Sequence, residues 1–326
     1  METETLSLAD PAAEARALAL LAAGELVALP TETVYGLAAD ATNGAAVAKI
    51  FAAKGRPSFN PLICHVPGLA MARDLALVGA VAETLAGAFW PGPLTIVMPL
   101  KPGSAVHPLC TAGLPTVALR CPRGVVARLA EALGRPIAAP SANPSGRVSA
   151  TTADHVRQGL GGRVPLILDG GPCPVGVEST IVLPQDDHLV LLRPGRIDRA
   201  ALTEATGLPV RSRGEGDAVT APGQLASHYA PAGRVRLDAA RIEPGEHVIA
   251  FGPQPSAGIE QAAAVVNLSP RGDLIEAAAN LFAALAAFDS PDIARIAVAP
   301  IPREGLGEAI NDRLQRAAAP RTVTLR

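Results

Sequence analysis

Two cations, Lys54 and Arg56, stand two residues apart in a segment that also carries hydroxyls and a carboxylate at positions 31–33. Such groups could bind an anion, because ammonium and guanidinium groups neutralise phosphate or carboxylate oxygens and hydroxyls orient them. A helix end attracts Lys and Arg by itself, so either cation taken singly needs no ligand to explain it. Their combination with the polar cluster leads us to interpret residues 29–65 as one wall of a site.

The elements around this pair are predicted to be a strand, a polar turn, a helix and a second strand. Residues 25–29 form an apolar run that predicts a buried strand, and ligands of open α/β sheets commonly lie past the carboxyl ends of such strands. Gly36 is expected to allow a tight bend after this strand. Asn43 is expected to cap a helix that ends at Gly55, between the two cations. We expect these cations to cap the helix and to serve the site.

Polar residues directly after apolar strands recur along the chain. Each of them singly is normally a turn former, but their repetition within one α/β unit predicts a shared crevice. They are Thr31, Arg120, Ser141 with Asn143, Ser179 and Arg193. Together with the Lys/Arg pair, these arginines could neutralise a polyphosphate, so we predict an anionic ligand.

The chain has 326 residues, of which 49% are hydrophobic and 18% charged, enough for a sizeable core and one to three domains. Strand-length apolar runs, such as residues 116–120, alternate with helical patterns, such as 125–133, which predicts an α/β fold. The composition becomes polar near residue 211, and an α/β pattern resumes at Arg234. We therefore predict three parts. They are a larger domain at 1–210, a linker at 211–233 and a small α/β domain at 234–326.

Composition and motifs argue against several other functions. The net charge is −2 and no Lys/Arg stripe occurs, which argues against a nucleic-acid coat or an anionic membrane surface. No phosphate-binding P-loop, no dinucleotide fingerprint after a strand and no metal-ligand spacing is found. The four cysteines form no disulfide pattern and the amino terminus is not a signal peptide. We expect a soluble, cytoplasmic protein without membrane contact.

Seven short motifs within residues 10–207 are similar to those of one protein family. They are Pro30–Gly36, Lys54–Pro57, Asn60–Leu62, Trp90–Thr95, Pro140–Asn143, Gly176–Thr180 and Leu192–Gly195. In combination they resemble the YrdC-like threonylcarbamoyl-AMP synthases. The segment Ser227–Pro231 and the domain after it resemble the long, two-domain form. The resemblance implies a YrdC-like twisted mixed sheet with helices and a concave substrate cavity, followed by a small Rossmann-like α/β domain.

The resemblance also implies a nucleotidyltransferase reaction. L-Threonine, bicarbonate and ATP would give threonylcarbamoyl-AMP, pyrophosphate and water, with Mg²⁺ arriving on the ATP and no metal held by the protein. The product would pass to a tRNA threonylcarbamoyl transferase complex that modifies adenosine 37 of tRNAs reading codons that begin with A. Direct contact with RNA is left open.

The family's Lys-x-Arg and Ser-x-Asn signature corresponds to Lys54, Arg56, Ser141 and Asn143, and the resemblance makes Lys54 and Arg56 the expected catalytic residues. Residues expected at ATP are Lys54, Ser58, Thr116, Asn143, Ser149, Thr151, Arg193 and Tyr229. Residues expected at threonine are Thr31, His65, Arg120, Ser141 and Ser179. Arg120 suits the carboxylate of an amino acid because a guanidinium group is a bidentate fork.

The expected mechanism needs positioning and charge neutralisation rather than a covalent nucleophile. The threonine amine would attack bicarbonate or carbon dioxide, and the resulting carboxylate would attack the α-phosphorus of ATP. The linker at 211–233 is expected to act as a lid that excludes water from the acyl-adenylate, with a plain tether as the alternative.

Two other functions stay open. One is a non-enzymatic RNA-binding module, against which the balanced charge argues. The other is a different carbamoyl or nucleotidyl transfer, as in the YrdC-like domain of hydrogenase maturation factors, against which the absence of a C-x-x-C motif argues. The role of the C-terminal domain is not predicted.

Overall fold

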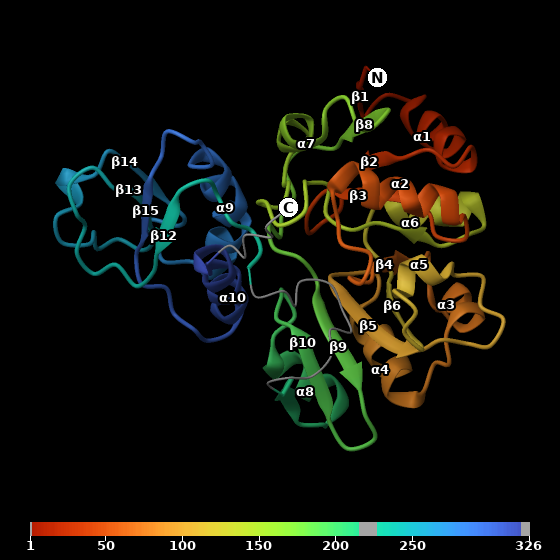
Figure 1. Cartoon of the computed structure of the whole chain (residues 1–326). Coiled ribbons are helices and arrows are strands. Elements are labelled where there is room, and N and C mark those ends of the chain that lie inside the picture. Colours follow the sequence, from red (N-terminus) through yellow and green to blue (C-terminus); the bar gives the residue numbers. More distant parts are fainter. Residues whose placement is uncertain (1, 215–226, 321–326) are drawn as a thin grey trace.

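The computed structural model describes residues 2–214 and 227–320, which form two α/β bodies side by side (Figure 1). The strands of the larger body are β1 (Glu4–Ser7), β2 (Val27–Leu29), β3 (Gly36–Asp40), β4 (Ile63–His65), β5 (Leu94–Pro99), β6 (Thr116–Arg120), β7 (Ile137–Ala138), β8 (Leu166–Asp169), β9 (Thr180–Pro184), β10 (Leu189–Arg193) and β11 (Val210–Ser212). Its helices are α1 (Ala13–Ala22), α2 (Gly44–Lys54), α3 (Leu69–Leu75), α4 (Ala80–Phe89), α5 (Pro108–Thr111), α6 (Val125–Leu133), α7 (Ala153–Leu160) and α8 (Arg199–Thr206).

Within the described residues, these strands form one sheet in the order β1-β8-β2-β3-β7-β4-β6-β5-β9-β10-β11 (Figure 1). The sheet is mixed, since β6 pairs in parallel with β4 and antiparallel with β5. The predicted mixed sheet with flanking helices is therefore confirmed. The predicted strand at 116–120 and the predicted helix at 125–133 have the bounds that the structure gives to β6 and α6.

Helices cover both faces of the sheet, as the side chains of β3 show. Leu37 and Ala39 belong to a hydrophobic cluster that includes Ile50 of α2. Ala38 between them belongs to a second cluster, together with residues of α1 and α6. Successive side chains of a strand point to opposite faces, so one short strand contributes to two cores. This double burial explains why the strand consists of small and apolar residues up to Ala39.

The strand β3 itself is a correction to the sequence prediction, which expected only a turn between β2 and the helix. β2 and β3 pair antiparallel, with Leu29 opposite Gly36. The strand was missed because Gly and Ala have low β propensity and the run shows no alternation. Gly36 is also not a left-handed bend residue. A Cβ atom there would lie 3.1 Å from the Cβ of Ala139, so glycine permits a close approach of two backbone segments.

The smaller body is the expected Rossmann-like domain. It contains β12 (Arg234–Arg236), β13 (His247–Ala250), the 3₁₀ turn η1 (Ile259–Gln261), β14 (Ala264–Asn267), α9 (Leu274–Ala287), β15 (Arg295–Val298) and α10 (Leu306–Ala318). Its four strands are all parallel, in the order β12-β15-β13-β14. In Figure 1, α9 and α10 lie on the side of this sheet that faces the larger body. None of the helices within the described ranges has an apolar run that could span a bilayer.

The predicted division at 1–210, 211–233 and 234–326 stays a prediction. β11 spans residues 210–212 and pairs in parallel with β10, so the strand crosses the first predicted boundary. Residues 215–226, which make up most of the predicted linker, lie outside the described residues.

The two bodies share a hydrophobic core. Val34, Val148 and Val177 of the larger body pack in the same cluster as side chains of α9 and α10. At Gly176 the two backbones lie close together. This residue has a φ of +74°, and a Cβ atom on it would lie 2.3 Å from the carbonyl oxygen of Ala278. The site of contact therefore requires glycine for both its conformation and its size.

Gly176→Ala is expected to destabilise the protein more than Gly171→Ala. Gly171 has a similar φ of +79°, but a Cβ atom on it would have no neighbour within 4 Å, so its substitution costs only the left-handed strain, about 1–2 kcal/mol. Overpacking against α9 adds about 1–3 kcal/mol at Gly176. Urea unfolding of the two variants measures the difference. Equal losses of stability would contradict the close contact between the bodies.

Candidate functional site

A small cavity lies where the turn between β2 and β3, the ends of β4, β6 and β10, and the segments after β7, before β9 and before β12 meet. Its volume is about 50 Å³, little more than the space of one or two water molecules. Seven predicted site residues line it, namely Arg56, His65, Arg120, Ser141, Ser179, Arg193 and Tyr229. A larger hollow of about 430 Å³ lies between β10, α8 and α10, but none of the predicted residues lines it. The small cavity is therefore the candidate site.

Lys54 and Arg56 are held by backbone carbonyl groups. Asn43 caps the start of α2 through its Oδ1, and Gly55, at a φ of 61°, ends the helix as predicted. The Nζ atom of Lys54 donates to the carbonyls of Ser141 and Asn143. Arg56 donates from Nε to the carbonyl of Asn60 and from Nη2 to that of Pro61, at 3.3 and 2.9 Å.

These contacts contradict the expectation that the two cations cap α2. Their hydrogen bonds go to carbonyls outside that helix, because both side chains turn into the interior, where Lys54 is 3% exposed and Arg56 9%. Burial lowers the pKa of Lys54 well below its usual range, and the charge of Arg56 acts in the same direction. Burial likewise lowers the pKa of Arg56 to about 10, which leaves it charged at neutral pH.

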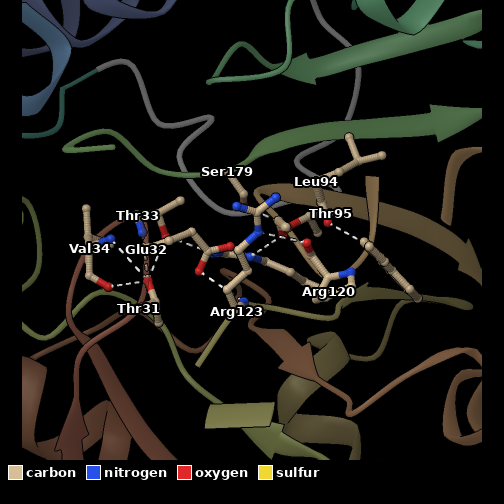
Figure 2. A network of polar contacts seen from close by, with 12 residues as sticks. Thr31, Glu32, Thr33, Val34, Leu94, Thr95, Arg120, Arg123 and Ser179 are labelled. Atoms are coloured by element: carbon tan, nitrogen blue, oxygen red, sulfur yellow. Dashed lines mark hydrogen bonds and ion pairs between the residues drawn. The ribbon is translucent and has the colours of Figure 1, made fainter. Parts of the chain in front are cut away.

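Arg193 approaches the cavity from the end of β10. Its Nε and Nη2 donate to the carbonyl and the hydroxyl oxygen of Ser179, each at 3.0 Å. The Ser179 hydroxyl also lies 2.8 Å from that of Thr95 (Figure 2). Burial lowers the pKa of Arg193 to about 10.

The three buried cations share one property. Among the described residues, no carboxylate forms an ion pair with Lys54, Arg56 or Arg193, whose hydrogen-bond partners are carbonyls and one hydroxyl. Buried charges are normally paired, so three cations without anions are costly and fit a multiply charged anionic ligand.

Arg120, by contrast, already has an anionic partner. Its Nη2 lies 2.8 Å from Oε1 of Glu32, with both side chains at most 10% exposed. Nη1 donates to the hydroxyl of Thr33 at 2.9 Å, and Nε donates to the carbonyl of Gly92 at 3.2 Å. The contact with Glu32 lacks hydrogen-bond alignment. Figure 2 shows this network, in which every nitrogen of the guanidinium group contacts a protein oxygen.

The hydroxyl of Thr31, predicted to face threonine, is engaged within its own turn. It donates to the carbonyl of Val34 at 2.7 Å and accepts the backbone N–H groups of Thr33 and Val34. Its remaining contact is the Thr33 hydroxyl at 2.8 Å, which must be the donor because the Thr31 proton is already used. Thr33, and not Thr31, lines the cavity.

His65 lies in the cavity wall as a neutral ring. Its Nδ1 is 3.3 Å from the carbonyl of Ile137, which can only accept, so Nδ1 carries the proton. Burial, reinforced by the charge of Arg120, lowers the pKa of His65 to about 3. The ring can therefore accept a hydrogen bond through Nε2 at neutral pH.

Acid is expected to destabilise the folded chain through His65. Its folded-state pKa, about 3, lies below the ordinary value of 6.5, so the unfolded chain binds more protons. The stability that His65 contributes is full above pH 6.5 and is lost as the pH falls toward 3. By pH 5 the loss is about 2 kcal/mol relative to pH 8. Urea unfolding at both pH values should show a smaller acid loss for His65→Gln. An equal loss in both proteins would contradict the buried neutral ring.

The other predicted residues lie outside the small cavity. Asn143 and Ser149 line a separate cavity of about 300 Å³, which α9 and Asp289 help to enclose. Thr151 is buried with its hydroxyl 3.4 Å from Nδ1 of His155. Ser58 is exposed, and Thr116 begins β6 at the end opposite Arg120. Lys54 connects the two cavities, because its ammonium group holds the loop of Ser141 and Asn143.

Two known families match the chain in succession. The Sua5/YciO/YrdC family, described as telomere recombination, matches residues 19–195. A family described as threonylcarbamoyl-AMP synthase, C-terminal domain, matches residues 197–319. The chain belongs to the Sua5/YrdC family.

Similarity to members of the Sua5/YrdC family extends over both bodies. A protein of Bacillus subtilis (strain 168) named threonylcarbamoyl-AMP synthase is 41% identical over 337 residues, covering 98% of this chain and 97% of the relative. A protein of that name from Pyrococcus abyssi is 39% identical and covers 92% of both. The structure of P. abyssi Sua5 complexed with L-threonine has a TM-score of 0.86 and 34% identity, with 98% of both chains covered. The resemblance found in the motifs is confirmed.

Sequence reasoning on this Sua5/YrdC chain missed three polar residues of the cavity wall, Thr33, Glu178 and His228. Each lies inside one of the family motifs, beside a residue that was selected. The sequence could not distinguish Thr31 from Thr33 in the same turn. Hydrogen bonds within the turn engage the Thr31 hydroxyl, and Thr33 is the residue that faces the cavity. His228 and Tyr229 enter the wall from the segment before β12, with their rings edge to face at 4.1 Å. Tyr229 has a φ of 62°, which is rare for a residue with a side chain.

Proposed function

We propose that this chain is an L-threonylcarbamoyladenylate synthase, a nucleotidyltransferase that makes threonylcarbamoyl-AMP and pyrophosphate from L-threonine, bicarbonate and ATP. The observation that carries the proposal is the set of three buried cations without carboxylate partners among the described residues, which suits a polyphosphate. The names of the full-length relatives support the same activity.

Lys54 and Arg56 are proposed to neutralise the phosphates of ATP. Arg193 is proposed to neutralise the part of the bound substrates' negative charge that lies nearest Ser179. Because these side chains are fixed by backbone carbonyls, they need little reorganisation as charge develops in the transition state. Mg²⁺ is proposed to arrive bound to the phosphates of the substrate ATP. The carboxylate in the cavity wall, Glu178, already accepts hydrogen bonds from Ser149 and Arg313.

L-Threonine is proposed to bind at the side of the cavity that Arg120, Thr33 and His65 line. The P. abyssi structure with L-threonine supports an amino-acid substrate. The substrate carboxylate would join Glu32 at Arg120, and the neutral His65 would accept a hydrogen bond from the substrate. The amine would then attack bicarbonate, with loss of water, or carbon dioxide, with loss of a proton. The carboxylate formed would attack the α-phosphorus of ATP and displace pyrophosphate.

The cavity must open for these substrates, because about 50 Å³ holds neither of them. His228 and Tyr229 are proposed to move away for substrate binding and to return over the bound nucleotide. Closure would exclude water from the acyl-adenylate. The product is proposed to pass to a tRNA threonylcarbamoyl transferase complex.

The proposal is tested by measuring pyrophosphate release from ATP. Release should require L-threonine and bicarbonate together, and omission of either should abolish it. Release supported by carbamoyl phosphate in place of bicarbonate would favour the other carbamoyl transfer. Salt-sensitive RNA binding without any ATP turnover would favour an RNA-binding module and overturn the proposal.

A further inference from the structure

The C-terminal body places one charged side chain against the cavity wall. Arg313 of α10 is completely buried, and its Nε donates to Oε2 of Glu178 at 2.9 Å. Glu178 lines the cavity, and its other oxygen, Oε1, accepts the hydroxyl of Ser149 at 2.7 Å. The Arg313 guanidinium also lies 5.7 Å from the centre of the Tyr229 ring. One arginine of the smaller body thus contacts two residues of the candidate site.

The carboxylate of Glu178 would weaken phosphate binding in this cavity. A carboxylate in the wall can form ion pairs with the cations that should bind the ligand, and it repels phosphate oxygens. The negative charge of Glu178 already acts on two of those cations, Lys54 and Arg193. Burial lowers the pKa of Lys54 and of Arg193, and the negative charge of Glu178 opposes this effect at both. The site therefore needs other hydrogen-bond and ion-pair partners for this carboxylate.

Arg313 provides that partner. Burial alone would raise the pKa of Glu178, but the charges of Arg313 and Arg193 and the hydrogen bonds from Ser149 and Arg313 lower it to about 2. Glu178 is consequently ionised, and both of its oxygens accept hydrogen bonds from residues other than Lys54, Arg56 and Arg193. Arg313 also forms a second ion pair, since its Nη1 lies 2.8 Å from Oδ2 of Asp312.

We propose that Arg313 is a positioning residue that holds the carboxylate of Glu178 away from the phosphate-binding cations Lys54 and Arg193. The C-terminal domain thereby sets the charge that the cavity offers to the nucleotide. This inference rests on the proposed function, because it takes the ligand of these cations to be a nucleoside triphosphate.

The two partners of this ion pair make opposite contributions to ATP binding. In Arg313→Met, Glu178 is released to pair with the cations, so the Kd for Mg·ATP should rise about tenfold. In Glu178→Gln, a negative charge is removed while Arg313 keeps Asp312, so the Kd should fall a few-fold. The double variant should return to within about threefold of the unchanged protein. A purely structural pair would instead weaken binding in both single variants.

The experiment is calorimetric titration of the full chain with Mg·ATP, beside steady-state pyrophosphate release. Arg303→Met is the matched control, since this exposed arginine of the same body pairs with Asp238 and not with the site. Its Kd should not change. If Arg313→Met does not fold, the sign of the effect in Glu178→Gln decides alone. Weaker ATP binding in Glu178→Gln, or a double variant as impaired as Arg313→Met, would overturn the proposal.

Failure of this inference is distinguishable from failure of the proposed function. A chain that binds Mg·ATP with the expected pattern but makes no acyl-adenylate would retain the inference and lose the threonine-dependent reaction. A chain that makes the product while both single variants weaken ATP binding would retain the function and lose the inference.

Discussion

Replacing Lys54 by methionine is expected to reduce the rate of pyrophosphate release by about 10²–10³-fold. The ammonium group is buried, has no carboxylate partner among the described residues, and lies between the two cavities. Its loss removes a positive charge from the proposed phosphate site and releases the loop of Ser141 and Asn143. The measurement is kcat and KM for ATP at saturating threonine and bicarbonate.

The matched control for Lys54 is another lysine of the same helix. Lys49 is 43% exposed at its side chain and donates to Glu25 and to the carbonyl of Gly24. Lys49→Met should lower activity less than about twofold, because exposed ion pairs contribute only about 0–1 kcal/mol. Lys54→Met with activity as high as Lys49→Met would remove Lys54 from the catalytic residues.

Replacing Arg120 by glutamine is expected to raise the KM for threonine about 100-fold and to destabilise the fold. Arg120 has to serve both the substrate carboxylate and Glu32, and its loss leaves Glu32 as an unpaired, largely buried charge. Breaking a buried ion pair by removing one partner costs about 3–5 kcal/mol. Threonine-dependent kinetics and urea unfolding measure the two effects separately.

A second substitution separates these two effects. Adding Glu32→Gln to Arg120→Gln removes the unpaired charge, so stability should recover while the threonine KM stays high. Arg128→Gln is the control, because Arg128 pairs with Glu14 at the surface, where both side chains are at least 40% exposed. Recovery of both stability and threonine KM in the double variant would show that Arg120 acts only as the partner of Glu32.

The sequence predicted elements well wherever local chemistry decides the structure. Asn43 at the start of α2 and Gly55 at its end act through hydrogen bonds and backbone conformation within a few residues, so their types suffice. β3 was missed because its Gly–Leu–Ala–Ala run has no alternating pattern, although tertiary packing buries both of its faces. Burial from two sides is a property of the fold, not of the run.

The sequence could predict which types of residue line the candidate site, but not which of these residues contact one another. Seven of the residues selected by motif resemblance line the cavity, but the resemblance could not show that Arg120 is engaged by Glu32. It also selected Thr31 where the cavity meets Thr33, because the hydrogen bonds that hold the Thr31 hydroxyl within its own turn are not visible in the sequence. The contact between Glu178 and Arg313 joins residues 135 positions apart, and no local pattern connects them.

The left-handed backbone of Tyr229 would favour the open state in the proposed opening of the cavity. At a φ of 62° this residue lies about 1–2 kcal/mol above its relaxed conformation, and the energy is regained when the segment moves away. An offset of that size favours opening by about tenfold. The ring is held closed by Phe282 at 5.2 Å and by Arg313. In the proposed opening of the cavity, the strain at Tyr229 would partly offset these closing contacts, so that they would not prevent release of pyrophosphate and acyl-adenylate.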